Sequence, residues 1–445
     1  MSNACCSRRT ILLVYAVCLA ATAACVVRSF QDVNRTIGVD FRNRVVGARV
    51  LAAGQDPYRF EWKPGMPEEQ LDPFYNEEGT PRLTAPPTVL SLYLPVSWMP
   101  YRWLRNLSCG TEWAFLIATI LVCKRSIPTT GMRLAFLIFA TVCVAASDFW
   151  RIHVERGQIY VFHTLPLALG IAWSLRDKRD SWRAGIMFGI ATALRPNLGL
   201  FIPGMLVLGR KKTTLSATAT TLACVALTLP FAPPATWQSY FAMGDIYYQS
   251  LSDPQSIEPA PRPPVRESVE SYSTKTEEAV LDHPVLPTAF VVWLSQGRSG
   301  IDWGFLCKLG LLLLGGATLG SLALIRFLRT DEERFEESRL VVPRAPLAFL
   351  TAAAIATEFL LPQRWTYCDV ILLPLIALAW PWFAEQSLGR LVAIVLVPAW
   401  ILSISGLPVS AELAAATWRA WGTVAGIALL SASMGRQPRF PIAPA

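Results

Sequence analysis

Asp40, within Gly38-Val39-Asp40-Phe41-Arg42, is the residue with the strongest case for chemistry in this sequence. It closely follows the first long apolar stretch, and its neighbours are apolar or small, so we expect it to lie near a membrane interface. A carboxylate held at the mouth of a protected cavity can act as a general base and remove the proton of a nearby hydroxyl group. Arg42 and Arg44 are close enough in sequence to keep this carboxylate charged or to bind an anionic ligand.

A structural role for Asp40 is the alternative. Residues Phe41 to Ala53 have the pattern of a helix that ends before Gly54, and aspartate is a favoured residue at a helix N-cap. One side chain can play both roles, so the pattern leaves both open. Asp56 is followed by Pro57, and we interpret it as a turn residue.

Three arginines in predicted outer connections are candidates for binding phosphate. Arg156 and Gln158 precede one apolar stretch, Arg195 divides two short ones, and Arg364 and Tyr367 lie at the outer end of a late one. A guanidinium group can bind phosphate oxygens through two hydrogen bonds at once. The alternatives are arginines that extend to the lipid headgroups and, for the late stretch, an aromatic belt at the interface.

Glu358 and His153 are further polar residues next to apolar stretches. Glu358 lies about one turn before the outer end of its stretch, where a carboxylate should face a polar cavity or pair with a cation. We expect it to pair, with Arg364 as a candidate partner. His153 is a candidate proton donor, although a lone histidine is more often structural.

The composition indicates that membrane-spanning helices position these residues. Of 445 residues, 53% are hydrophobic and only 16% are charged, whereas a soluble domain usually carries about 25% charged residues. The net charge of +8 is spread between the apolar stretches, so we interpret the basic residues as topology signals and expect no nucleic-acid partner.

Twelve apolar stretches predict an all-α integral membrane protein, a polytopic bundle of about twelve transmembrane helices. The fifth and sixth are short, and could be half-depth helices that meet at Pro196. The predicted spans are residues 11–27, 110–123, 132–148, 159–175, 183–195, 197–209, 213–231, 303–325, 345–361, 367–383, 391–406 and 413–432.

The distribution of basic residues places the N-terminus in the cytoplasm and two long connections outside. The first outer loop, 28–87, contains Asp40, and the second, 232–301, is proline-rich and expected to be partly flexible. Thr88–Met99 is too short to cross a bilayer and is predicted to be re-entrant or interfacial. Trp237–Leu251 is predicted to form an amphipathic helix on the outer face.

The sequence predicts neither a metal centre nor a cofactor. Its ten cysteines lack metal-like spacing, and it has three histidines. It also has no glycine-rich phosphate loop and no Asp-x-Asp sequence. We therefore do not expect a nucleotide sugar held by a metal ion.

Several segments, in their order along the chain, resemble the family 87 glycosyltransferases. The resemblance covers roughly residues 35–212 and implies a GT-C fold, because members of this family are multi-spanning GT-C enzymes that use a polyprenyl-phosphate sugar on the outer face. It implies one GT-C membrane domain, residues 1–445, in the plasma (inner) membrane with its active site on the extracytoplasmic face. The segments are Asp40-Phe41, Gly54 to Tyr58, Pro86-Pro87, Gly157-Gln158, Ala184-Gly185 and Ala193 to Pro196.

The resemblance also implies roles for residues. Asp40 occupies the position of the family's catalytic base, and Gly157-Gln158 match a Gly-Gln pair at the head of a span. Arg195 stands where the family usually has lysine, which keeps the charge but changes the geometry of phosphate binding. Thr366-Tyr367 stand where many members have His-Tyr, so no histidine role is transferred there.

We therefore expect a glycosyltransferase that moves a hexose from a polyprenyl-phosphate donor to a lipid or glycan acceptor, with inversion. Mannose is the first expectation for the sugar and arabinofuranose the second, both from the resemblance alone. The alternatives are a polytopic lipid or solute transporter or flippase, and a non-catalytic scaffold for envelope assembly. Besides Asp40 as base, the predicted substrate-binding residues are Arg42, Arg156, Gln158, Arg195, Arg364 and Tyr367.

Overall fold

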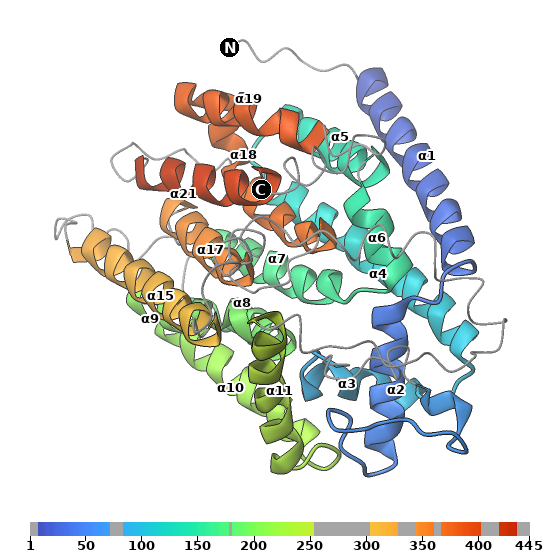
Figure 1. Ribbon diagram of the computed structural model, residues 1–445. Helices are drawn as coiled ribbons and strands as arrows, with labels where there is room; N and C mark the ends of the chain where they lie inside the picture. The colour runs from blue at the N-terminus through green and yellow to red at the C-terminus, as the bar shows by residue number, and fades with distance from the viewer. Residues whose placement is uncertain are drawn as a thin grey trace.

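The computed structural model describes residues 8–71, 83–146, 148–177, 180–252, 303–327, 344–359, 366–401 and 418–433. Every regular element in these ranges is a helix (Figure 1), which confirms the all-α prediction for this part of the chain. The helices of the N-terminal half are α1 Arg8–Val33, α2 Val39–Ala52, α3 Pro87–Tyr93, α4 Tyr101–Arg125, α5 Thr130–Ala146, α6 Asp148–Arg156 and α7 Tyr160–Arg176. Those that follow are α8 Trp182–Leu194, α9 Phe201–Val207, α10 Lys211–Thr228, α11 Pro234–Ser252, α15 Trp303–Phe327, α17 Arg344–Phe359, α18 Leu372–Glu385, α19 Ser387–Ile401 and α21 Thr423–Ser433.

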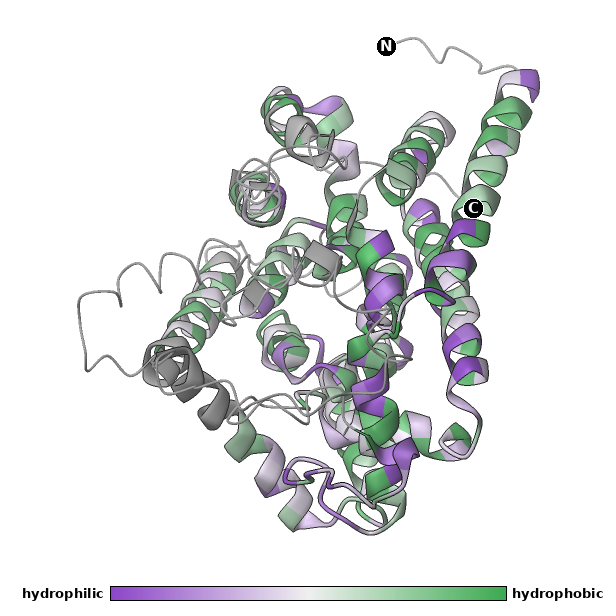
Figure 2. Ribbon diagram, turned by 45° about the vertical axis from the view of Figure 1, so that its right-hand side comes forward, coloured by the Kyte–Doolittle hydropathy of each residue, from purple (hydrophilic) through white to green (hydrophobic). Residues whose placement is uncertain are grey.

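Three helices in the described ranges are long and apolar enough to cross a membrane, namely α1, α4 and the segment Cys368–Glu385 that includes α18. In α1 apolar side chains such as Leu13 and Leu19 are exposed. Figure 2 shows α1 at the right, hydrophobic through most of its length. Such a surface suits contact with lipid. The count of twelve spans is not confirmed and stays a prediction.

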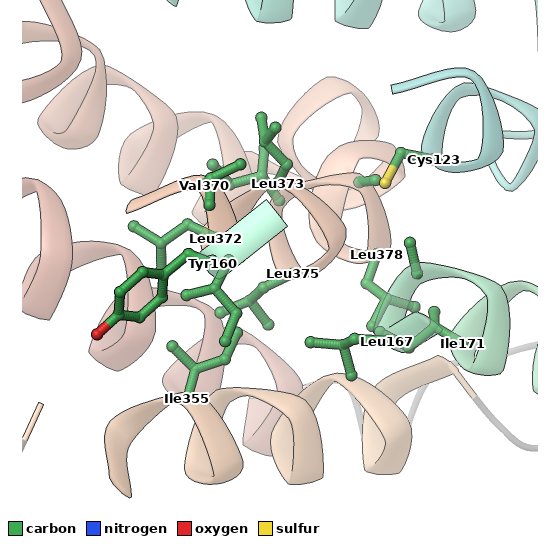
Figure 3. Packing of buried hydrophobic residues seen from close by; sticks show 14 of the residues in the cluster. Cys123, Tyr160, Leu167, Ile171, Ile355, Val370, Leu372, Leu373, Leu375 and Leu378 are labelled. Carbon is green, nitrogen blue, oxygen red and sulfur yellow. The ribbon is translucent and has the colours of Figure 1, made fainter. Parts of the chain in front are cut away.

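The core of the molecule surrounds α18. Its residues from Leu372 to Ala379 are all buried, as expected for a helix that is hydrophobic on every side. Figure 3 shows Leu372, Leu375 and Leu378 packed among side chains of α7 and α17. This packing fixes α7, whose N-terminal end begins two residues after Gln158.

The predicted break at Pro196 is present. Helix α8 ends at Leu194, Arg195 is extended, and a 3-10 turn, η3 Pro196–Leu200, leads into α9. With 13 residues, α8 is about 20 Å long, shorter than the roughly 30 Å hydrocarbon core. The division into two short helices is confirmed.

The segment predicted as the first outer loop contains helical residues in its described part. Helix α1 continues to Val33, six residues beyond the predicted end of the first span, and α2 begins at Val39. The stretch predicted as interfacial forms the short helix α3 and a 3-10 turn, η2 Leu94–Val96, too short to cross a bilayer. Figure 1 shows α2, α3 and α11 gathered at one end of the molecule.

In the segment predicted as the second outer loop, the predicted amphipathic helix corresponds to α11, which begins three residues earlier than expected. The rest of this loop, including the proline-rich part, lies outside the described residues.

Candidate functional site

Asp40 lies in the first turn of α2, and its position is set by the glycine before the helix. Gly38 is the N-cap residue and has a left-handed backbone with φ of 68°. No side chain caps this helix end. The N-cap alternative for Asp40 is therefore wrong, and its carboxylate contacts residues from another part of the chain.

The Asp40 carboxylate is bound by two donors that follow each other closely in sequence. Arg156 Nε lies 2.6 Å from Asp40 Oδ2, and Gln158 Nε2 donates to the same oxygen. No partner of Oδ1 is found in the described part of the chain. The Asp40 side chain is 22% exposed, so this side chain is not sealed from solvent.

Arg44 fixes the orientation of Gln158. It lies one turn after Asp40 on α2, on the same face of the helix. Its guanidinium donates to Gly157 O and to Gln158 Oε1, at 2.8 Å in each case. Because Arg44 binds the amide oxygen, the amide nitrogen of Gln158 faces Asp40. We call Asp40, Arg44, Arg156 and Gln158 the Asp40 site.

The predicted partner Arg42 does not join this site. Its side chain donates to the carbonyl oxygens of Glu68 (3.1 Å) and Leu71 (3.5 Å) and lies over the Tyr101 ring. Burial lowers the pKa of Arg42, an effect that Tyr101 and Glu69 partly oppose. The expectation that Arg42 lies against Asp40 is wrong, because α2 directs it toward the loop instead.

Arg195 belongs to a second cluster, which we call the Arg195 cluster. Its Nε lies 2.6 Å from Glu358 Oε2, and one terminal nitrogen donates to Tyr160 OH at 3.0 Å. Figure 3 shows the Tyr160 hydroxyl pointing away from the hydrophobic packing. Glu358 thus pairs with a cation as predicted, but that cation is Arg195. The predictions for Arg364 and Tyr367 are not tested, since Arg364 lies outside the described residues and the structure describes no side chain for Tyr367.

His153 is fully buried in α6 and does not reach a site that a substrate could enter. Its ring stacks on Trp150, and its Nδ1 lies 3.4 Å from Glu112 Oε2. Burial lowers the pKa of His153, while Glu112 partly opposes this shift. A neutral, enclosed imidazole is a structural group, so the proton-donor interpretation fails.

An apolar pocket of about 160 Å³ adjoins the Asp40 site. Phe41, the neighbour of Asp40, forms part of its wall together with residues of α3, α4 and α7. Leu92 and Leu107 line it and are about half exposed, so the pocket opens to the outside between α3 and α4. The sequence analysis missed this pocket, although the apolar stretch at α3 indicated one wall. Among the described residues, no group of His, Cys, Asp and Glu is arranged to hold a metal ion.

Comparison with protein families gives a match over part of the chain. The model of glycosyltransferase family 87 matches residues 84–261. The chain is therefore similar to glycosyltransferase family 87 over this range. The matched range contains Arg156, Gln158 and Arg195 but begins after Asp40 and Arg44, so the family 87 match covers only part of the Asp40 site. No curated protein and no solved structure matches the chain.

Proposed function

We propose that this chain is a family 87 glycosyltransferase that transfers a hexose from a polyprenyl-phosphate donor to a lipid or glycan acceptor, with Asp40 as general base. The observation that carries the proposal is the Asp40 carboxylate itself. Arg156 and Gln158 hold its Oδ2, the side chain is partly exposed, and the next residue, Phe41, lines an apolar pocket. An oriented, accessible acceptor atom is what a general base requires.

The reaction is a single displacement. Asp40 Oδ1 takes the proton of the acceptor hydroxyl as the hydroxyl oxygen attacks the anomeric carbon. The bond between that carbon and the phosphate oxygen breaks, and the phosphate leaves with the electron pair, which inverts the configuration at the anomeric carbon. The protein must hold the reactants in line and stabilise the charge that develops on the phosphate.

Arg195 is the residue best placed among the described cations to stabilise the leaving phosphate. Glu358 and Tyr160 hold two of its nitrogens, and the third has no partner in the described ranges. Its side chain is 22% exposed. A guanidinium fixed on one edge by a buried carboxylate can still present its other edge to an anion. Arg364 and Tyr367 remain proposed ligands of the donor.

The apolar pocket supports a lipid-linked substrate. Its walls are mostly apolar, and they include Phe41, the neighbour of Asp40, and the exposed side chains Leu92 and Leu107. A polyprenyl chain entering between α3 and α4 would gain roughly 25 cal/mol for each Å² of apolar surface removed from contact with water. We place this chemistry in a GT-C bundle, at the extracytoplasmic face of the plasma membrane, with mannose as the favoured hexose by family resemblance.

The test is transfer by Asp40→Asn in membranes supplied with radiolabelled polyprenyl-phosphate mannose. We expect a loss of about 100- to 10,000-fold in transfer rate, the usual contribution of a general base. Asp56→Asn is the matched control, because Asp56 is a turn acceptor for the Tyr58 N–H, a bond that an amide oxygen can also accept. We expect this control to retain transfer.

Normal transfer by Asp40→Asn would remove Asp40 as the base. If wild-type protein consumed no polyprenyl-phosphate sugar but moved labelled lipid between leaflets of a vesicle, the flippase alternative would replace the proposal.

A further inference from the structure

Arg105 of α4 is a buried cation that lies between the two segments that form the Asp40 site. Its side chain is buried, and one terminal nitrogen donates to Val154 O and Glu155 O, at 2.5 Å in each case. These carbonyls belong to the last turn of α6, directly before Arg156. The guanidinium also lies over the Phe41 ring, 5.5 Å from its centroid. One side chain therefore contacts the neighbours of both Asp40 and Arg156.

Two glycines make room for this guanidinium. Gly38, before α2, and Gly157, after α6, both have a φ of 68°. A Cβ atom at Gly38 would lie 2.5 Å from Arg105 Nε, and one at Gly157 would lie 2.7 Å from the terminal nitrogen Nη1. One turn thus lies next to Asp40 and the other between Arg156 and Gln158. Both contact the guanidinium, and neither has space for a side chain.

Stability alone does not account for a cation at this place. Arg105 Nε and Nη1 are buried and have no hydrogen-bond partner in the described part of the chain. Burying donors without acceptors is unfavourable, and an apolar side chain of similar size would avoid that cost. What an apolar side chain cannot do is bind the two carbonyls at the end of α6, where a positive charge is also favoured by the helix dipole.

We propose that Arg105 is a positioning residue of the Asp40 site. It joins the turn at Gly38 to the turn at Gly157, and so sets the separation between the Asp40 carboxylate and its donors Arg156 and Gln158. This inference rests on the proposed role of Asp40, but the contact between the two turns can be tested without any activity.

The activity test compares Arg105→Met and Arg105→Lys with the wild-type protein. Arg105→Met removes the bonds to the α6 carbonyls, and we expect kcat to fall about 100-fold, as for a displacement of about 1 Å at a reacting centre. We expect KM for the lipid donor to change less than about twofold, because Arg105 does not line the pocket. Arg105→Lys keeps a charged donor for the carbonyls and should recover part of the lost kcat.

Arg102→Met is the matched control for this test. Arg102 lies one turn earlier on α4 and is exposed, and its side chain donates to Asn34 Oδ1 at 3.4 Å. We expect it to leave kcat unchanged. A wild-type kcat in Arg105→Met, or an equal loss in Arg102→Met, would overturn the proposal.

The second test measures thermal unfolding in detergent and needs no substrate. Gly38→Ala introduces both a left-handed alanine and a clash with Arg105, whereas Gly54→Ala introduces only the left-handed alanine, since nothing lies within 4 Å of its Cβ. We expect Gly38→Ala to lower Tm more than Gly54→Ala. In an Arg105→Ala background this difference should shrink.

The two tests separate the possible failures. Suppose that Gly38→Ala still lowers Tm more than Gly54→Ala by the same amount in the Arg105→Ala background. Arg105 then does not join the two turns, and the positioning role is wrong even if the enzyme is active. If this difference in Tm disappears but neither the wild-type protein nor any variant transfers sugar, Arg105 does join the two turns and the proposed function fails instead.

Discussion

The Asp40 site and the Asp369–Arg419 pair contain the same two residue types in opposite surroundings. Asp369, in the 3-10 segment η5 Thr366–Ile371, contacts Arg419, in the short π-helical segment η6 Trp418–Gly422. The two side chains are 0% and 1% exposed. In the Asp40 site the corresponding values are 22% for Asp40 and 9% for Arg156.

This difference in exposure distinguishes a structural carboxylate from one that can react. Asp369 and Arg419 are enclosed by core residues, so their charges are compensated but inaccessible. Asp40 is held by its Arg156 and Gln158 contacts on one oxygen only, and it adjoins a pocket. Pairing with arginine therefore does not distinguish the two sites, whereas the exposure of the carboxylate side chain does.

Among the variants at these two sites, we expect Asp369→Asn to have the largest effect on stability. Removing one charge of a fully buried pair leaves the other uncompensated, and we expect a loss of about 3–5 kcal/mol in the free energy of unfolding. Thermal unfolding and the yield of folded protein in detergent would measure it. Asp40→Asn, at a partly exposed pair, should cost clearly less.

Activity per folded molecule completes this test. We expect Asp369→Asn to retain most of it, and Asp40→Asn to lose it. The comparison would break if Asp369→Asn abolished transfer while leaving the unfolding temperature of the wild-type protein unchanged.

The Arg195 cluster combines a partly exposed arginine with a buried carboxylate. Arg195→Met would show whether this pair binds substrate or is only structural. If Arg195 binds the donor phosphate, losing a charge-assisted hydrogen bond worth about 1.5–3 kcal/mol should raise the donor KM about 10- to 100-fold. Glu358→Gln is the companion variant, because it loosens Arg195 without removing the guanidinium. Substrate titrations would measure both. An unchanged donor KM in Arg195→Met together with a large loss of stability would place the pair with Asp369 and Arg419.

The smallest effect that we expect is a dependence of stability on pH through His153, a buried residue of α6. Arg44 and Arg105 add to the burial that lowers the pKa of His153 from its usual 6.5, and Glu112 opposes it. The unfolded chain therefore takes up a proton that the folded protein excludes. This contribution to stability is fully present above about pH 6.5 and decreases as the pH falls below that value.

Unfolding temperatures measured from pH 7.5 down to pH 5 would show this dependence, and His153→Gln should reduce its slope. An equal slope in His153→Gln would mean that other groups cause the acid sensitivity.

Much of the site could be predicted from residue types and order. Asp40, Arg156 and Gln158 were all named as site residues, and the structure brings these three together across more than a hundred residues. Arg42 was placed wrongly because sequence proximity does not show which face of a helix a side chain occupies. Arg44 binds Gln158 instead, since residues four apart lie on one face of α2.

Local sequence patterns are enough to predict a helical protein with apolar stretches and a break at Pro196 between two short helices. These follow from local composition, helix periodicity and the missing proline N–H, which act within a few residues. Only the tertiary structure decided that Glu358 pairs with Arg195, that Asp369 is sealed in the core, and that Arg105 fits between Gly38 and Gly157. Those contacts join distant segments, and a side chain's partner there depends on how whole helices pack.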